Sequence, residues 1–166
     1  IGYWEGAINE STPSNPRSLY GIAKTALREA ARLETAKAGG VFQWLRCYYI
    51  VGDDARSRSL FSRILAWEAE GRAAFPFTSG RNLYDFIAVE DLAAQIVRAA
   101  LQEGVTGVIE CCSGQPVALR DKVEAFLSAH ALAIRPEYGA FPDRPYDSPG
   151  VWGDASKIQA VLAASR

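Results

Sequence analysis

Tyr20 and Lys24 lie four residues apart in the stretch SLYGIAK, a spacing that proton transfer can use. In a helix, residues four apart project side by side from one face. An ammonium group beside a phenol favours the phenolate, and such a tyrosine can exchange a proton with a hydroxyl or a carbonyl group. The alternative is that both residues decorate an exposed helix. With 7 tyrosines in 166 residues, the spacing alone does not decide between the two.

The surrounding sequence predicts a long helix for this pair. Ser18 is a typical N-cap, residues 19–38 are mostly strong helix formers, and Gly39-Gly40 ends the run. Residues 2–17 are rich in Gly, Pro, Ser, Thr and Asn, and we predict a loop there. Residues 41–51, VFQWLRCYYIV, are almost continuously apolar, which predicts a strand buried on both faces of a parallel sheet.

The rest of the chain continues this alternation of strands and helices. Further patterns predict a helix over residues 60–70, a short strand ending at Val89 and followed by a helix, a strand over 107–113, a helix over 119–131, a proline-rich loop over 135–149 and a last helix from about Asp154. Only about three strands are evident. The alternation nevertheless indicates an α/β fold with a parallel sheet.

Composition excludes several classes of protein. A chain of 166 residues, 49% of them hydrophobic, can bury a substantial core. Its net charge of −1, without a basic stripe, argues against a nucleic-acid partner. No apolar run approaches the roughly 20 residues that span a bilayer, and Glu5 and Glu10 are not typical of a signal peptide. We therefore expect no nucleic-acid partner and no membrane partner.

The cysteines point to a reducing compartment. Cys47, Cys111 and Cys112 are odd in number, and neither their spacing nor the single histidine resembles a disulfide framework or a metal knuckle. We predict buried, reduced thiols, no metal site and a cytoplasmic location.

Five segments resemble, in the same order, segments of one known family. ESTPSNPRSLYGIAK is similar to the region around the catalytic tyrosine of the extended short-chain dehydrogenases/reductases, the NAD-dependent epimerases and dehydratases of nucleotide sugars. The other matching segments are LRCYYIVG, YDFIAVEDLA, VIECCSGQPVALRDKVEAF and RPYDSPGVWGDASKI. Together they cover nearly the whole chain.

The resemblance implies a mechanism. Tyr20 would be the general acid/base at the sugar C4 oxygen, and Lys24 would favour its ionised form and hold the nicotinamide ribose. Tyr48 and Tyr49 would border the nicotinamide of NAD or NADP. The substrate would be a sugar or a nucleotide sugar, and the outer face of the helix that carries Tyr20 would pair with its symmetry mate in a homodimer.

The resemblance also implies a division of the chain. Residues 1–52 would be the C-terminal part of a doubly wound, Rossmann-like dinucleotide-binding domain. Residues 53–166 would be mostly a smaller α/β substrate-binding region, with 84–113 returning to the sheet. The glycine fingerprint of the family is absent, so the chain resembles the C-terminal half of such an enzyme. Alone, it is expected to bind the cofactor poorly or not at all.

Departures from the family pattern bear on the substrate. Tyr49 stands where Asn is common, and Tyr84 replaces an arginine that contacts substrate diphosphate, which counts against a standard nucleotide-diphosphate sugar. Arg144 remains as a possible anion contact, although it could equally be a solvated loop residue, and Arg81 is close enough in sequence to compensate. The predicted substrate-binding residues are thus Tyr49, Arg81, Tyr84 and Arg144. Asp85 is expected to be structural.

Two functions from different classes follow. The first is an NAD(P)-dependent epimerase, dehydratase or ketoreductase that acts on a sugar hydroxyl or carbonyl by hydride transfer, with Tyr20 as acid/base. The second is an inactive fragment, or a non-catalytic binding or regulatory protein of the same fold.

Overall fold

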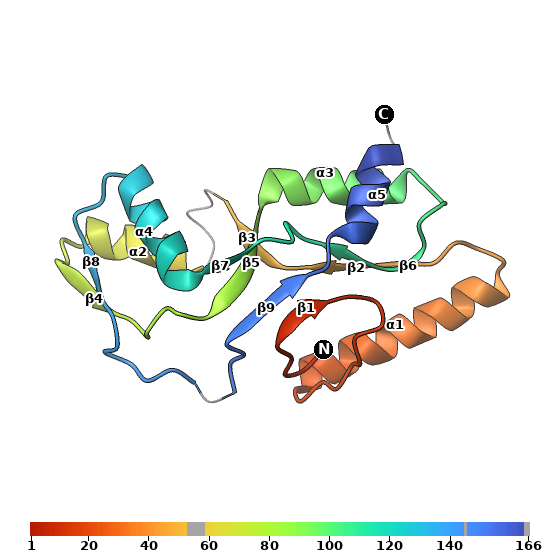
Figure 1. Ribbon diagram of the computed structural model, residues 1–166, viewed down its shortest axis with the longest axis horizontal. Coiled ribbons are helices and arrows are strands. Elements are labelled where there is room, and N and C mark those ends of the chain that lie inside the picture. The colour runs from red at the N-terminus through yellow and green to blue at the C-terminus, as the bar shows by residue number, and fades with distance from the viewer. Residues whose placement is uncertain (53–58, 145, 165–166) are drawn as a thin grey trace.

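The structure is a computed structural model that describes residues 1–52, 59–144 and 146–164. It is an α/β fold, as the sequence predicts. Its helices are, in chain order, α1 (Leu19–Lys37), α2 (Leu60–Ala69), α3 (Val89–Ala100), α4 (Leu119–Ala129) and α5 (Ser156–Ala164). Figure 1 shows α3 and α5 on one side of the central strands and α1 on the other, while α2 and α4 belong to a smaller lobe at one end.

The central strands are mostly parallel. Within the described ranges, one sheet has the order β1-β9-β5-β3, with β7 antiparallel on β5, and β2 and β6 form a separate parallel pair. In the smaller lobe β4 pairs with β8. The strands are β1 (Gly6–Ile8), β2 (Gln43–Cys47), β3 (Tyr49–Val51), β4 (Ala74–Pro76), β5 (Leu83–Ala88), β6 (Gly107–Cys111), β7 (Pro116–Ala118), β8 (Arg135–Glu137) and β9 (Gly150–Gly153).

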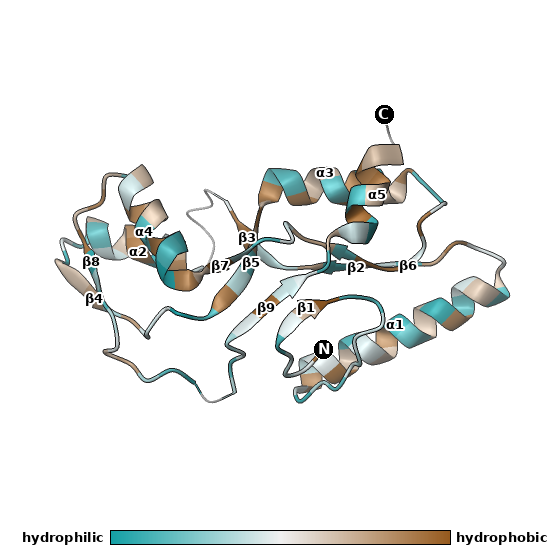
Figure 2. Cartoon of the chain, viewed as in Figure 1, coloured by the Kyte–Doolittle hydropathy of each residue, from teal (hydrophilic) through white to brown (hydrophobic). Residues whose placement is uncertain are grey.

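Helix α1 forms as its local signals predict. The Ser18 hydroxyl accepts a hydrogen bond from the Gly21 amide at 3.1 Å, which caps the first turn. Beyond the last turn, Gly39 takes a left-handed backbone conformation with φ +67°, which favours glycine. No residue of α1 is buried in this chain, and Figure 2 shows hydrophilic and hydrophobic bands alternating along it.

The apolar run 41–51 differs from its prediction. It is divided into β2 and β3, with Tyr48 between them, and its residues are half-buried or exposed rather than enclosed on both faces. The reason is that β2 pairs with β6 whereas β3 pairs with β5, so the chain changes partner at Tyr48. One face of β2 also borders an open pocket rather than a packed layer.

Several short strands lie where loops are predicted. The predicted loop 2–17 contains β1, and the predicted loop 135–149 contains β8. These strands have three residues each, too few to show a period-two pattern in the sequence. The predicted helices, in contrast, are confirmed with ends that shift by two residues or fewer.

Two hydrophobic clusters stabilise the two ends of the molecule. The first packs α3 and α5 onto the sheet through Ile87, Leu92, Ala99, Ile109, Cys111, Ile158 and Val161. The second fills the smaller lobe with Ile64, Phe75, Phe77, Val123, Leu127 and Ile134. Asp85 lies at the middle of the sheet, fully buried, and its carboxylate accepts hydrogen bonds from Ser113, Gly114 and Gly153. These contacts fit the structural role expected for it.

The cysteine prediction is wrong for one residue. Cys111 and Cys112 are buried, but Cys47, at the end of β2, is exposed. All three thiols are free. Within the described ranges, none of the helices combines the length and the apolar character that a membrane span requires.

Candidate active site

Tyr20 and Lys24 lie side by side on the first turns of α1. The Lys24 Nζ is 5.7 Å from the centroid of the Tyr20 ring. The Tyr20 side chain is 74% exposed, so its hydroxyl is open to a ligand. The preceding residues fix this turn of the helix, since a Cβ at Gly21 would lie 2.9 Å from Pro16 and 3.3 Å from the Ser18 hydroxyl. The structure therefore brings a phenol and an ammonium group together on an accessible surface.

A pocket of about 500 Å³ opens beside this pair, between α1 and β2. Tyr20 and Lys24 line one wall, and Tyr48 lies in the opposite wall. Arg28 also lines it and donates to the Ser14 hydroxyl at 3.3 Å. The volume is in the range that holds small ligands. Three of the four predicted cofactor-binding residues, Tyr20, Lys24 and Tyr48, thus line one pocket.

A buried polar cluster joins two residues of the wall opposite α1, Arg46 and Tyr48, to Glu110. Glu110 on β6 is 3% exposed and accepts from Arg46 Nη1 at 2.8 Å and from the Tyr48 hydroxyl at 2.9 Å. Burial raises the pKa of the Glu110 carboxyl, and Arg46 opposes this shift. Burial, and then the Glu110 charge, raise the pKa of Tyr48 far above that of a free phenol. Tyr48 is therefore a neutral hydrogen-bond donor to Glu110.

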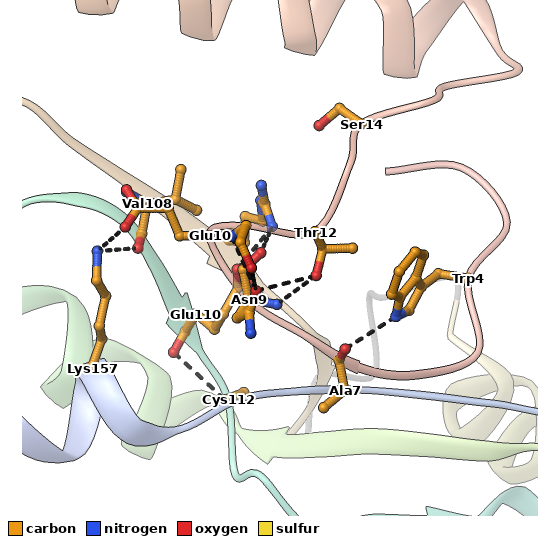
Figure 3. A network of polar contacts seen from close by, with 12 residues as sticks. Trp4, Ala7, Asn9, Glu10, Thr12, Ser14, Val108, Glu110, Cys112 and Lys157 are labelled. Atoms are coloured by element: carbon orange, nitrogen blue, oxygen red, sulfur yellow. Dashed lines mark hydrogen bonds and ion pairs between the residues drawn. The ribbon is translucent and has the colours of Figure 1, made fainter.

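The segment that leads to Tyr20 is attached to the sheet by Glu10. Its carboxylate accepts from the Val108 amide at 3.0 Å and from Lys157 Nζ at 2.6 Å. Lys157 also donates to the carbonyl oxygens of Thr106 and Val108. Figure 3 shows this arrangement, with Lys157 reaching from α5 to the edge of β6. Gly107 has φ +76°, a left-handed conformation that favours glycine, and a Cβ there would displace the Glu10 carboxylate.

The predicted substrate-binding residues form a second group. The rings of Tyr49 and Tyr84 have centroids 4.5 Å apart. Burial, and then the neighbouring Tyr49, raise the pKa of Tyr84 to about 12, while Arg144 is near enough to oppose this. Partial burial and the nearby Asp147 likewise raise the pKa of Tyr49. Tyr49 on β3 and Tyr84 on β5 are thus in ring contact, and Arg144 is near enough to influence Tyr84 electrostatically.

Arg81 and Arg144 are both exposed. Asp143, next to Arg144 in the chain, has a carboxyl whose pKa is lowered by hydrogen bonds from Ser79 and to a lesser extent by Arg81. Arg81 therefore lies near the same loop, but no contact joins it to Tyr49 or Tyr84 within the described residues. Tyr49 does not line the pocket beside Tyr20, whereas Tyr48 does.

Sequence reasoning missed Arg46 and Glu110. A signal was present, because each is a charged residue inside an otherwise apolar strand. They are register partners on β2 and β6, 64 residues apart in sequence. That pairing is not visible without the fold.

The pocket fits one end of a dinucleotide cofactor. It is open, ring-sized and lined by an aromatic residue from each wall, Tyr20 and Tyr48. The Lys24 ammonium offers donors for a ribose hydroxyl. The sequence contains no glycine-rich phosphate loop.

A family model and a curated relative match this chain. The model of the NAD dependent epimerase/dehydratase family matches residues 4–112. A dTDP-6-deoxy-L-talose 4-dehydrogenase (NAD(+)) from Aggregatibacter actinomycetemcomitans is 45% identical over 154 residues, which are 92% of this chain and 57% of the relative. The chain thus spans a little over half the length of that relative.

Solved structures share the fold. A UDP-N-acetylglucosamine 4-epimerase from Methanobrevibacter ruminantium, in complex with UDP-N-acetylmuramic acid, superposes with a TM-score of 0.79 at 20% identity, over 93% of this chain and 50% of the epimerase. A UDP-glucuronic acid 4-epimerase from Bacillus cereus, with UDP-glucuronic acid and NAD, gives 0.80 at 20% identity, over 98% and 52%. RMD from Pseudomonas aeruginosa, complexed with NADPH, gives 0.80 at 17% identity, over 94% and 52%.

Proposed function

This chain belongs to the NAD-dependent epimerase/dehydratase family, and we propose that it supplies the acid/base tyrosine and the sugar-binding region of an enzyme that transfers a hydride at C4 of a nucleotide-activated sugar. One observation carries the proposal: Tyr20 and Lys24 lie together, 5.7 Å from ammonium nitrogen to ring centroid, in an open pocket. Against the expectation drawn from Tyr84, the 45% identity to a dTDP-6-deoxy-L-talose 4-dehydrogenase favours a dTDP-6-deoxyhexose as the substrate.

The two residues of the pair have different tasks. When bound, the nicotinamide takes up or gives back the hydride. As the sugar C4 hydroxyl is oxidised to a ketone, the Tyr20 oxygen takes its proton, and in the reverse direction it returns that proton. The Lys24 ammonium stabilises negative charge on the Tyr20 oxygen and holds a hydroxyl of the nicotinamide ribose. An epimerase or a dehydratase would use the same proton transfer as its first step.

The substrate would extend from this pocket across the sheet. We assign residues 1–52 to the cofactor side and 53–166 mostly to the sugar side, with 84–113 returning to the sheet. Tyr48 and Tyr49 are adjacent in the chain, so the Tyr49–Tyr84 pair begins one residue beyond the nicotinamide pocket. Arg144 and Arg81 supply positive charge for a diphosphate. Free thiols at Cys47, Cys111 and Cys112 support the expected cytoplasmic location.

The test is NADH formation by the purified full-length protein with dTDP-6-deoxy-L-talose and NAD⁺. We expect turnover, and weaker turnover with the same sugar lacking the nucleotide. Lys24→Met should reduce the rate more than Lys37→Met, a matched change on the exposed last turn of the same helix. No NADH with the dTDP-sugar, together with no conversion of UDP-hexoses, would reject the proposal and favour a non-catalytic protein.

A further inference from the structure

The two faces of the β2–β6 pair have different characters. Leu45 and Ile109 point into the cluster beneath α3 and α5. Because successive side chains alternate between faces, their neighbours Arg46 and Glu110 point to the opposite side, toward α1 and its pocket. Arg46 and Glu110 are direct partners in the register of the two strands. Arg46 therefore lines the Tyr20 pocket, and the buried Glu110 is its ion-pair partner on the neighbouring strand.

Each oxygen of the Glu110 carboxylate has its own donor. Oε1 accepts from Arg46 at 2.8 Å and Oε2 accepts from the Tyr48 hydroxyl at 2.9 Å. The Glu110 side chain is 3% exposed and that of Arg46 is 14% exposed. A buried ion pair recovers little more than its own desolvation cost, so it is a weak source of net stability. The main structural effect of this ion pair is that it fixes two groups beside the pocket.

The first of these groups is the segment that leads to Tyr20. Arg46 Nη1 also donates to the Asn9 carbonyl at 3.2 Å. The side-chain oxygen of Asn9 accepts from the backbone amide and the hydroxyl of Ser11, and the backbone amide of Asn9 donates to the Thr12 hydroxyl. Figure 3 shows Glu110 and Asn9 lying close together, where the segment passes over β6. Through Arg46, Glu110 thus holds the turn that precedes α1.

The second group is the Tyr48 ring. It lies against the backbone of β9, because a Cβ at Gly153 would be 2.9 Å from a Tyr48 ring carbon. On its other side the residue lines the pocket with Tyr20 and Lys24. The bond to Glu110 fixes the ring at the point where the chain passes from β2 to β3.

We propose that Glu110 is a positioning residue for this site: it fixes Tyr48 in one wall of the pocket and, through Arg46 and the Asn9 carbonyl, fixes the segment that leads to Tyr20. The proposal rests on the proposed function. Glu110 does not touch the reacting atoms. It sets the separation of two walls that must hold the hydride acceptor and the proton acceptor at the right distance from the same sugar carbon and its hydroxyl, and a displacement of about 1 Å in such a site costs roughly 100-fold in rate.

The test is Glu110→Gln in the full-length protein, assayed with NAD⁺ and the dTDP-sugar. The change removes the charge that pairs with Arg46, and a glutamine amide nitrogen placed against Tyr48 can only donate, so the Tyr48 hydroxyl must turn from donor to acceptor. We expect kcat to fall about 10- to 100-fold, while the KM of the sugar and the Kd of NAD⁺ change less than about threefold. The matched control is Glu124→Gln, which removes a carboxylate that accepts from Tyr138 at 2.7 Å in the smaller lobe.

Tyr48→Phe keeps the ion pair and covers the case in which Glu110→Gln does not fold. The Tyr48→Phe change should likewise lower kcat by a larger factor than it changes the KM of the sugar. In the double variant the two losses should be less than additive, since both changes alter the same contact between residues 48 and 110.

Separate outcomes identify which claim has failed. If Tyr20→Phe abolishes turnover but both Glu110→Gln and Tyr48→Phe keep kcat within about twofold of the parent, positioning by Glu110 is rejected and the proposed function stands. A fall in kcat no larger than that of Glu124→Gln also rejects it. If Tyr20→Phe is fully active, the proposed function fails and the positioning role fails with it.

Discussion

Glu10 and Lys157 are 147 residues apart in sequence, yet their side chains form an ion pair at 2.6 Å. Glu10 belongs to the segment before α1, and Lys157 lies in the first turn of α5. The Glu10 carboxylate also accepts from the Val108 amide. One side chain therefore ties the segment that leads to Tyr20 both to β6 and to the helix behind it.

This pair predicts a pH-dependent stability. The hydrogen bond from Lys157, and then that from Val108, hold the pKa of the Glu10 carboxyl below its usual 4.5. A carboxyl with a lowered pKa in the folded state stabilises the protein above its unfolded pKa, and this contribution is lost as the pH falls through the folded value. Glu10→Gln should lower the free energy of unfolding by about 1 kcal/mol at neutral pH.

Urea denaturation at neutral and at acidic pH measures this effect. The difference between parent and variant should shrink as the pH falls below 4.5. Glu34→Gln is the control, because it removes an exposed ion pair within α1 that has no partner on the sheet. A difference that persists unchanged in acid would contradict the assignment.

A larger loss of stability is predicted at Asp85. Its fully buried carboxylate accepts from the Ser113 amide and hydroxyl, the Gly114 amide and the Gly153 amide. Asp85→Asn places an amide nitrogen against these donors and leaves buried N–H groups unpaired, at a cost of about 3 kcal/mol or more. Asp91→Asn, an exposed change in the first turn of α3, should cost only about 0.5 kcal/mol. Equal midpoints of chemical denaturation in the two variants would show that the Asp85 contacts are unimportant.

The cysteines should differ in reactivity. Burial raises the pKa of Cys111 and of Cys112 to about 12 and, to a smaller extent, raises that of the exposed Cys47. Since the thiolate is the reactive form, an aromatic disulfide reagent at mildly alkaline pH should label Cys47 slowly and the other two only after unfolding. Rapid labelling of more than one thiol in the native protein would contradict the packing of β6.

A homodimer through α1 stays a prediction. Leu19, Ile22, Leu27 and Leu33 are all more than half exposed along this helix. If the helix pairs with its symmetry mate, Leu27→Asp should convert a dimer to a monomer in light scattering. Leu101→Asp, at an 80% exposed leucine after α3, should not. A monomeric parent would reject this interface.

The sequence predicted the features that local signals encode. The Ser18 cap, the helix formers that follow and Gly39 define α1 without reference to the rest of the chain, and α1 places Tyr20 beside Lys24. The strands were harder, because β1 has only three residues and its partner β9 lies more than 140 residues further on. The interruption at Tyr48 depends on which strand each half pairs with, and no pattern within 41–51 reveals it.

Only part of the site was predicted from the sequence. The resemblance gave Tyr20, Lys24 and Tyr48, which do line one pocket. It gave nothing for Arg46 and Glu110, whose importance comes from a register between two strands. Buried polar partners of this kind can be identified only once the fold is known, because in the sequence each is simply a charged residue inside an apolar strand.

The most direct test of the central claim is the rate of the Tyr20→Phe variant beside its affinity for the cofactor. The change removes one hydroxyl, and Tyr138→Phe, which removes a hydroxyl in the smaller lobe, is the control. If Tyr20 is the acid/base, kcat for oxidation of the dTDP-sugar should fall about 100-fold or more, while the Kd of NAD⁺ by calorimetry should stay within about threefold of the parent value. A Tyr20→Phe enzyme that turns over as fast as the Tyr138→Phe control would show that the proton goes elsewhere.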